Sequence, residues 1–246
     1  LAGTGREDLI RDSLYVHAFR NPDSANLTDI GYVMRKEKGA RLERIGAADL
    51  RDLEPALSPD FQAAVLIHDQ ARALAPGEIG TVLADKFRTL GGEILRQEVT
   101  AIRPEDGGWA YDTAEGPCRS HKLVLAMGVW STTLLKPLGI RIPMQAERGY
   151  HVSMYNPNFT APNPYMITDA QFVITPMDGF LRAAGVVEFG GLTAPASSAP
   201  VNLLRKQMKK VYPNESLTDK LNEIKKILGE AKLAREDGNT YLLRYD

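Results

Sequence analysis

Apolar side chains recur at intervals of three and four along several stretches of the chain, and this spacing predicts helices. The clearest case is residues 76–90, where a proline opens the first turn and two glycines, Gly91 and Gly92, follow the last. The other stretches expected to be helical are residues 6–20, the part of residues 46–57 that precedes Pro55, and residues 201–213.

Alternating apolar and polar positions predict strands in the middle of the chain. Residues 93–128 have the pattern of three strands joined by two turns, with a hairpin over residues 102–111. The last of these strands, residues 123–127, is apolar on both faces, so we expect it to be covered on both sides, as in a parallel sheet. The remaining stretches predict antiparallel strands in residues 144–155 and 170–191, and a hairpin or short strand with a charged turn in residues 29–45.

The character of the chain changes after Asn214. Thirteen of the 32 residues in 215–246 are charged, or 41%, against 25% for the whole chain. Four apolar residues fall at helical spacing, and Ser216 with Asp219 forms a variant capping box, so residues 217–233 are expected to be an amphipathic helix. Residues 239–246 are expected to be a short strand. The helix either docks on another surface, including a partner chain or second copy through residues 215–233, or is simply a solvated element.

Composition narrows the class of protein. The 246 residues allow one large or two small domains, and a net charge of −1 argues against nucleic acid or an anionic membrane as the main partner. A single cysteine, Cys118, excludes an internal disulfide and fits a reducing compartment. The chain has no apolar run of transmembrane length and no pattern of a signal peptide at its start, so a cytoplasmic location is expected.

The end of the apolar run 123–127 is a candidate binding element. A strand that stops at Gly128 and reopens as a helix brings bare backbone close to a ligand, and Ser131 can cap that helix. Free amides at a helix start favour an anion such as phosphate. The alternative is that Gly128 only turns a tight connection and Trp130 belongs to the core.

These segments together resemble a known family. The sequence LVLAMGVWS, the segment PLGIRIP and the motif RGYH follow one another as they do in the superfamily of D-amino-acid oxidases and dehydrogenases, and most of all in bacterial D-amino-acid dehydrogenases. Residues 80–102 and 180–192 resemble further segments of the same enzymes. The resemblance extends over residues 1–213.

The resemblance implies a fold, a cofactor and a site. The fold would be α/β, with α and β mixed: a partial FAD-binding sheet (residues 1–30 and 70–140) and a mostly antiparallel substrate-binding sheet (residues 31–69 and 141–213), followed by the charged tail 214–246. FAD would lie against Val99, Ala126, Met127, Gly128 and Trp130, although Met127 departs from the small residue usual in the family.

The same resemblance gives candidate substrate residues: Arg148, Tyr150, Met166 and Arg182, with Thr168 beside Met166. A guanidinium at Arg148 can hold the carboxylate of an amino acid through two parallel hydrogen bonds. Tyr150 shares its face of the strand, whereas His151 points the other way and is expected to be structural. Each of these residues has an ordinary alternative as a surface or core side chain. No catalytic acid–base pair is identified, and the three histidines outside the motif, His17, His68 and His121, have no metal-like spacing.

Two features depart from the family. The glycine fingerprint for the FAD diphosphate is missing, because Gly3-Thr4-Gly5 is followed by Asp8 at the third glycine position and is not preceded by a strand. The closing segments of the family are also not found after Pro213.

The function expected from the resemblance is FAD-dependent oxidative deamination of a D-amino acid, or a similar small amine acid, to a 2-oxo acid. The electrons would pass to a quinone or to oxygen. The alternative is a non-catalytic module that retains the substrate domain and acts as a binding or interaction protein.

Overall fold

The computed structural model describes residues 1–155, 157–159, 161–215 and 218–219. The chain divides into two compact units. The sheet unit contains residues 1–83 and 149–188 and the described residues from 195 onward, and the small unit contains residues 84–148 and 189–194. The expected α/β fold class is confirmed, whereas the assignment of residue ranges to FAD and to substrate stays a prediction.

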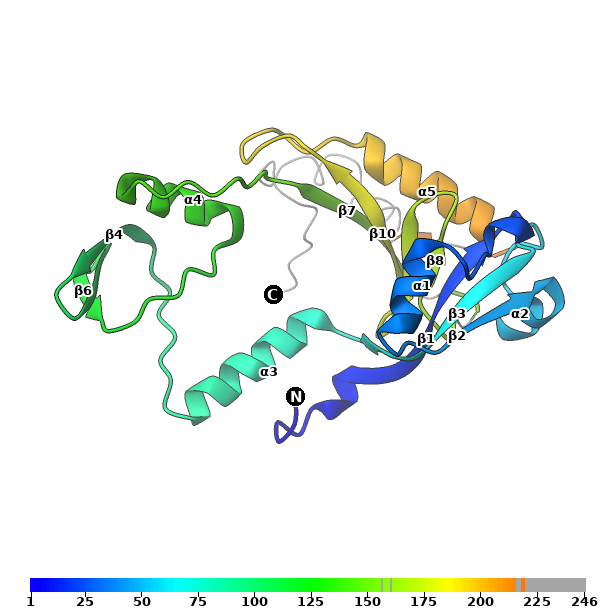
Figure 1. Cartoon of the computed structure of the whole chain (residues 1–246), viewed down its shortest axis with the longest axis horizontal. Helices are drawn as coiled ribbons and strands as arrows, with labels where there is room; N and C mark the ends of the chain where they lie inside the picture. Colours follow the sequence, from blue (N-terminus) through cyan, green and yellow to red (C-terminus); the bar gives the residue numbers. More distant parts are fainter. Residues whose placement is uncertain (156, 160, 216–217, 220–246) are drawn as a thin grey trace. The chain divides into compact units, whose positions relative to one another are not determined.

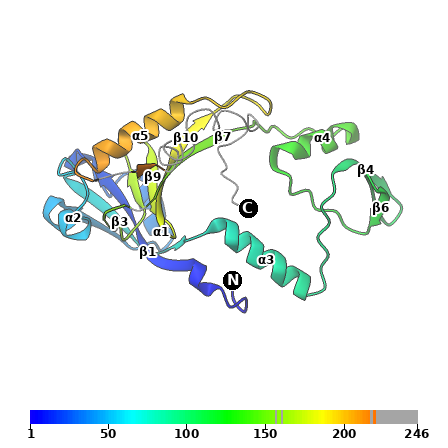
Figure 2. The same cartoon turned by 180° about the vertical axis from the view of Figure 1, so that it is seen from behind.

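The sheet unit is built on one mixed sheet of eight strands in the order β11-β7-β10-β9-β8-β1-β3-β2 (Figures 1 and 2). The long strands β1 and β3 pair antiparallel, and β1 pairs parallel with β8 on its other side. The strands are β1 (Ile10–Phe19), β2 (Leu42–Gly46), β3 (Ala63–Ala73), β7 (Arg148–Tyr155), β8 (Tyr165–Ile167), β9 (Phe172–Pro176), β10 (Phe180–Glu188) and β11 (Thr218–Asp219).

Two helices cover one face of this sheet, which we call the core face. They are α2 (Ala47–Leu53) and α5 (Ala199–Val211), and Figures 1 and 2 show α5 lying along the sheet beside β10. Leu50 of α2 and Leu204 and Met208 of α5 are buried in one core with alternate residues of the strands, such as Ile174 and Leu181. Burial of each such side chain contributes about 1.5–3 kcal/mol.

The opposite face is only partly covered, and we call it the open face. Helix α1 (Ile30–Glu37) packs there through Tyr32 against Phe19 and Val65. Farther along, the alternate residues of β9 and β10 that point away from the core are half-buried. The open face therefore has room for a ligand next to ordered strands.

The small unit contains an antiparallel sheet of β4 (Val99–Glu105), β5 (Gly108–Thr113) and β6 (Gly116–Ser120). The hairpin expected over residues 102–111 is confirmed by the pairing of β4 with β5. Helix α4 (Ser131–Leu135) supplies Leu134 and Leu135 to the core of this unit.

The strand expected at residues 123–127 is not formed. These residues have no regular secondary structure, and Val124 is 85% exposed. A strand is stable only when neighbouring strands satisfy its backbone groups, and no described strand pairs with this segment. The cap expected from Ser131 is also wrong, because Ser131 is the first residue of α4 and no side-chain cap is present there.

The helix expected at residues 76–90 is confirmed as α3 (Pro76–Thr89). None of its residues is buried, however, and Leu90 just after it is 77% exposed. The apolar stripe predicted the helix correctly, but within the described residues it has no covering surface.

The helix expected at residues 6–20 is wrong, because a short 3-10 helix (Glu7–Leu9) leads into strand β1. Val16 and Ala18 enter the core, while Tyr15 and His17, which alternate with them, point to the other side. Strands on both sides satisfy the backbone of β1, and this tertiary pairing outweighs the helical spacing of Leu9, Ile10 and Leu14.

A hairpin or a short strand was expected in residues 29–45. The first half of this range forms helix α1 instead, and the second half forms the single strand β2. Gly39, with φ of +88°, occupies the left-handed region and separates the two elements. The expected helices at α2 and α5 and the antiparallel pairing of β9 with β10 are confirmed.

The helix expected to begin at Ser216 is contradicted at its first described residues. Thr218 and Asp219 form strand β11, which pairs antiparallel with Tyr155 and Met154 of β7. The rest of residues 217–233 and 239–246 lies outside the described residues. Among the residues that are described, no helix is both long enough and apolar enough to cross a membrane.

Candidate functional site

A cavity of about 510 Å³ opens on the open face of the sheet unit, and we call it the open-face cavity. Its volume is in the range of small-molecule sites. Its walls come from β1, β3, β9 and β10 and from the start of α3, and none of its lining residues is an Asp or Glu. Its polar and flexible lining side chains include Ser13, Tyr15, Arg72, Thr175, Met177 and Arg182.

Arg182 reaches this cavity because of the alternation along β10. Leu181 and Ala183 are fully buried in the core, so Arg182 and Ala184 between and after them point to the open face. Arg182 was one of the substrate residues expected from the sequence, and it is the one that lines this cavity.

The cavity has a positive character that its own residues do not neutralise. The Nε atoms of Arg72 and Arg182 and the Oγ of Ser13 are buried, and none of them has a hydrogen-bond partner among the described residues. Arg72 is held by one bond, from Nη1 to the carbonyl oxygen of Pro162 at 2.6 Å. Burial and, secondarily, the charge of Arg11 lower the pKa of Arg72 from its usual range.

His151 of β7 lies within the electrostatic influence of Arg182, although it does not line the cavity. Burial, and then the charge of Arg182, lower the pKa of His151 from its usual value. His151 alternates with Tyr150 and Val152, which enter the core, so it lies on the open face of its strand. The structural role expected for His151 stays a prediction.

Arg148 and Tyr150 do not line the open-face cavity. The Tyr150 ring packs in the core, its hydroxyl donates to Glu188 Oε2 at 2.5 Å, and it accepts from the backbone N–H of Ser197 at 2.9 Å. Arg148 Nη2 donates to the carbonyl oxygen of Ala194 at 2.6 Å. The sequence carried a signal for Tyr150, since Val152 and Met154 continue an apolar face that starts with it.

Met166 and Thr168 lie near the far end of β1. Met166 pairs with His17 across the parallel strands β8 and β1 and is not part of the cavity lining. The Thr168 hydroxyl donates to the carbonyl oxygen of Ala18 at 2.8 Å, which stabilises the turn after β8.

Two cavity residues, Tyr15 and Arg72, were not among the site residues expected from the sequence. Tyr15 was placed in an expected helix, although Val16 and Ala18 two residues apart already had the spacing of a strand face. Arg72 lies near the end of β3, where charged and small residues follow the apolar run 63–67, and nothing local marks it as a site residue.

The residues expected to contact FAD all belong to the small unit. Val99 opens β4, and Ala126, Met127, Gly128 and Trp130 lie in or before the 3-10 helix Gly128–Trp130. Trp130 is 59% exposed, and Gly128 has φ of +56° with open space where a Cβ would stand. This exposed surface fits one wall of a dinucleotide site, because bare backbone and an aromatic ring are accessible there.

The described residues do not supply a cradle for the FAD diphosphate. Gly3 and Gly5 precede a 3-10 helix of three residues, and Asp8 in that helix pairs with Arg6. Helix α4 after Gly128 has only five residues, so its dipole is small. The residues present therefore fit FAD in part, on the side of Ala126 to Trp130 only.

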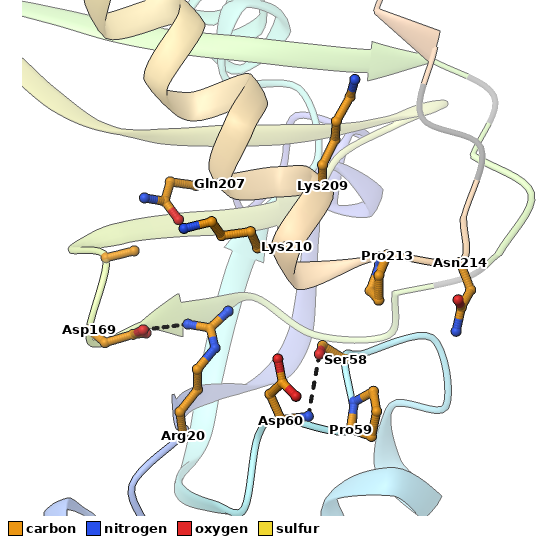
Figure 3. Close-up of a pocket in the computed structure, with 11 residues that line it drawn as sticks. Arg20, Ser58, Pro59, Asp60, Asp169, Gln207, Lys209, Lys210, Pro213 and Asn214 are labelled. Carbon is orange, nitrogen blue, oxygen red and sulfur yellow. Dashed lines mark hydrogen bonds and ion pairs between the residues drawn. The ribbon is translucent and has the colours of Figure 1, made fainter.

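A second cavity of the sheet unit, about 780 Å³, lies beside the end of α5 (Figure 3). Figure 3 shows Arg20 turned toward Asp169, with which it forms an ion pair, and Asp60 beside them. This cavity mixes positive and negative groups and contains none of the expected site residues. It is therefore a weaker candidate for an anionic ligand than the open-face cavity.

Comparison with known proteins identifies the family. Residues 2–228 match the family described as DAO, FAD dependent oxidoreductase. A D-amino-acid oxidase of Bradyrhizobium diazoefficiens is 30% identical over 211 residues, which are 85% of this chain and 50% of that protein. A glycine oxidase of Pseudomonas aeruginosa is 25% identical over 167 residues, which are 65% of this chain and 44% of that protein.

The fold is similar to that of a solved glycine oxidase from Geobacillus kaustophilus, with a TM-score of 0.72 at 18% identity, over 85% of this chain and 58% of that one. The chain spans about half the length of the curated relatives it matches. The match over residues 2–228 shows that the chain belongs to the DAO family of FAD-dependent oxidoreductases.

Proposed function

We propose that this chain carries the substrate-binding part of an enzyme that oxidatively deaminates a D-amino acid, or a similar small amine acid, to a 2-oxo acid. The observation that carries the proposal is the open-face cavity, where Arg182 lines the wall, its buried Nε has no acceptor, and no acid is among the described lining residues. Such a site favours a small molecule with a carboxylate.

In this proposal Arg182 holds the carboxylate of the substrate and Tyr15 lies in the cavity wall beside it. FAD, the cofactor of the family, would accept the two electrons and the hydrogen removed from the substrate, and Ala126, Met127, Gly128, Trp130 and Val99 would contact it. The proteins similar to this chain include both a D-amino-acid oxidase and a glycine oxidase, so both substrate classes are supported. A quinone or oxygen would be the final electron acceptor.

The second candidate is a non-catalytic binding module that retains the same cavity. It is favoured by one specific observation, the lack of a diphosphate cradle among the described residues. A partner chain or a second copy bound through residues 215–233 would belong to this proposal as well; of these residues the structure describes Glu215, Thr218 and Asp219.

The two candidates are separated by mixing the purified chain with added FAD and D-alanine, with oxygen excluded. Loss of the visible absorbance of oxidised flavin with D-alanine, and not without it, is expected for the enzyme. Binding of D-alanine without any flavin reduction would favour the binding module.

The carboxylate contact is tested by comparing Arg182→Ala with Arg148→Ala. Loss of one charged hydrogen bond costs about 1.5–3 kcal/mol, so D-alanine affinity should fall roughly 10- to 150-fold in Arg182→Ala. If Arg148→Ala alone weakens binding, the carboxylate is held where the sequence first predicted and not in the open-face cavity.

A further inference from the structure

We infer that the open-face cavity takes a substrate with two carboxylates, one bound by Arg182 and the other by Arg72. This inference rests on the proposed function, because it names the substrate class of the same site. The class is an amino acid whose side chain ends in a second carboxylate.

The first argument is the state of the two guanidinium groups. A buried polar atom without a partner is costly, and more so when it belongs to a charged group. The Nε atoms of both arginines are in this state, and the Oγ of Ser13 beside them is as well. Because these three residues line one cavity, their incompletely paired polar groups favour a ligand with several acceptor oxygens there.

The second argument is the position of the two arginines in the sheet. Arg72 lies on β3 and Arg182 on β10, and β9, β8 and β1 separate these strands. Four strand-to-strand steps correspond to about 19 Å in a flat sheet. The two side chains therefore enter the cavity from different sides, and two separate sets of donors favour two separate carboxylates.

The third argument is that no acidic side chain of the described residues competes for this position. Glu78, in the first turn of α3 next to the cavity, is paired with Arg6 at 2.9 Å. No Asp or Glu lines the cavity itself. A ligand with one carboxylate bound to Arg182 would leave the Arg72 guanidinium with its bond to the carbonyl oxygen of Pro162 but with no acceptor for its Nε among the described residues.

The apolar part of the lining agrees with a short carbon chain between the two charges. Val173, Met177 and Pro164 form part of the wall between the strands that carry the arginines. Methylene groups of a dicarboxylic amino acid would contact these side chains, while its ends reach the guanidinium groups.

The test uses amine-free probes, so that it needs neither flavin nor turnover. Glutarate and butyrate differ by the second carboxylate, and their binding to the purified full chain is measured by calorimetry at constant ionic strength. Glutarate is expected to bind at least about tenfold more tightly than butyrate, because its second carboxylate adds one charged hydrogen bond. Equal affinity, or no binding of either probe, would overturn the inference.

Three variants assign the contacts. Arg72→Gln should reduce glutarate affinity at least about tenfold and leave butyrate unchanged, whereas Arg182→Gln should reduce both. Arg41→Gln is the matched control, because Arg41 is an exposed arginine paired with Asp69 outside the cavity. A fall in glutarate affinity of the same size in Arg41→Gln would mean that the binding follows net charge only and would also contradict the inference.

The outcome is independent of the flavin experiment. Preference for glutarate without reduction of FAD by any amine would support the site and refute the oxidoreductase. Reduction of FAD by D-alanine without a preference for glutarate would support the oxidoreductase and refute the dicarboxylate class.

Discussion

At the scale of single residues, Glu54 is the group whose environment departs most from the ordinary one. It follows α2 and is 0% exposed, and neither carboxylate oxygen has a hydrogen-bond partner among the described residues. The hydroxyl groups of Tyr165 and Tyr212 are also buried and unpartnered among the described residues, and burial, followed by the charge of Glu54, raises the pKa of both. Burial raises the pKa of Glu54 to about 7.

We expect Glu54 to make the stability of the sheet unit depend on pH. Its pKa is higher in the folded than in the unfolded chain, so the stability of the folded chain is highest below about pH 4.5 and falls as the pH rises from there through about 7. The shift corresponds to about 3 kcal/mol of unfolding free energy. Glu54→Gln should therefore be more stable than the unchanged chain near pH 8 by about that amount, and nearly equal near pH 4.5, as measured by urea unfolding.

The control for this prediction is Glu37→Gln, since Glu37 is exposed at the end of α1. It should not change the pH dependence. A Glu54→Gln chain that is less stable at every pH would show that the carboxylate is ionised and paired in the folded chain.

At the scale of elements, the contribution of each helix to stability depends on what covers its apolar side. Helix α5 has Leu204 and Met208 fully buried against the sheet, whereas α3 has a longer apolar stripe and buries none of it. The two stripes look alike in the sequence. Only the pairing of an element with a covering surface converts an apolar stripe into stability.

Helix α5 offers a matched pair of substitutions. Met208→Ala should destabilise the sheet unit by about 2–5 kcal/mol, because Met208 is 1% exposed and leaves a cavity when shortened. Leu203→Ala, on the exposed side of the same helix at 46% exposure, should change stability by no more than about 0.5 kcal/mol. Thermal or urea unfolding of both variants tests this, and similar effects would mean that α5 is not docked as described.

The small unit depends on close backbone approach at Gly108, the first residue of β5. A Cβ placed there would meet the carbonyl oxygen of Ser120 at 2.3 Å, so Gly108→Ala should disrupt the pairing of β5 with β6. Gly80→Ala is the control, because Gly80 lies within α3 with no atom within 4 Å of a new Cβ. It should be neutral or stabilise by up to about 1 kcal/mol. Hydrogen exchange of the β4–β6 amides would show faster exchange in Gly108→Ala only.

At the scale of the whole molecule, the chain combines the cavity proposed for substrate with an incomplete form of the surface proposed for FAD. The open-face cavity is formed within the sheet unit alone. The surface around Gly128 lies in the small unit and lacks a diphosphate cradle among the described residues. The described residues therefore form the cavity proposed for substrate but only part of the surface proposed for FAD.

We expect the purified chain to hold FAD weakly or not at all. Binding of a dinucleotide diphosphate depends on a glycine-rich turn and the amides of a following helix, which the described residues do not provide. The measurement is the visible spectrum after gel filtration, with a known FAD-binding protein as the positive control. Flavin retained in a one-to-one ratio would contradict this expectation.

The sequence by itself determined the family, the fold class and the elements whose signals are local. The hairpin of β4 and β5, with Gly107 in its left-handed turn, and helix α2 before Pro55 are specified by residues within a few positions of each other. The family resemblance also marked Arg182 of β10 as a candidate, and the structure places it in the lining of a cavity, while its role stays a prediction.

Tertiary structure decided the features that depend on distant partners. Residues 6–20 have helical spacing, yet β1 forms because β3 and β8, more than forty residues away, satisfy its backbone. Residues 123–127 have strand composition, yet no described neighbour pairs with them. Tyr150 lies in the core because alternate residues of β7 share that core with helix α5, and Arg72 and Arg182 line one cavity only through the order of the strands. Local spacing determines which conformations a segment can adopt, and the free energy of pairing and burial, contributed by remote residues, selects among them.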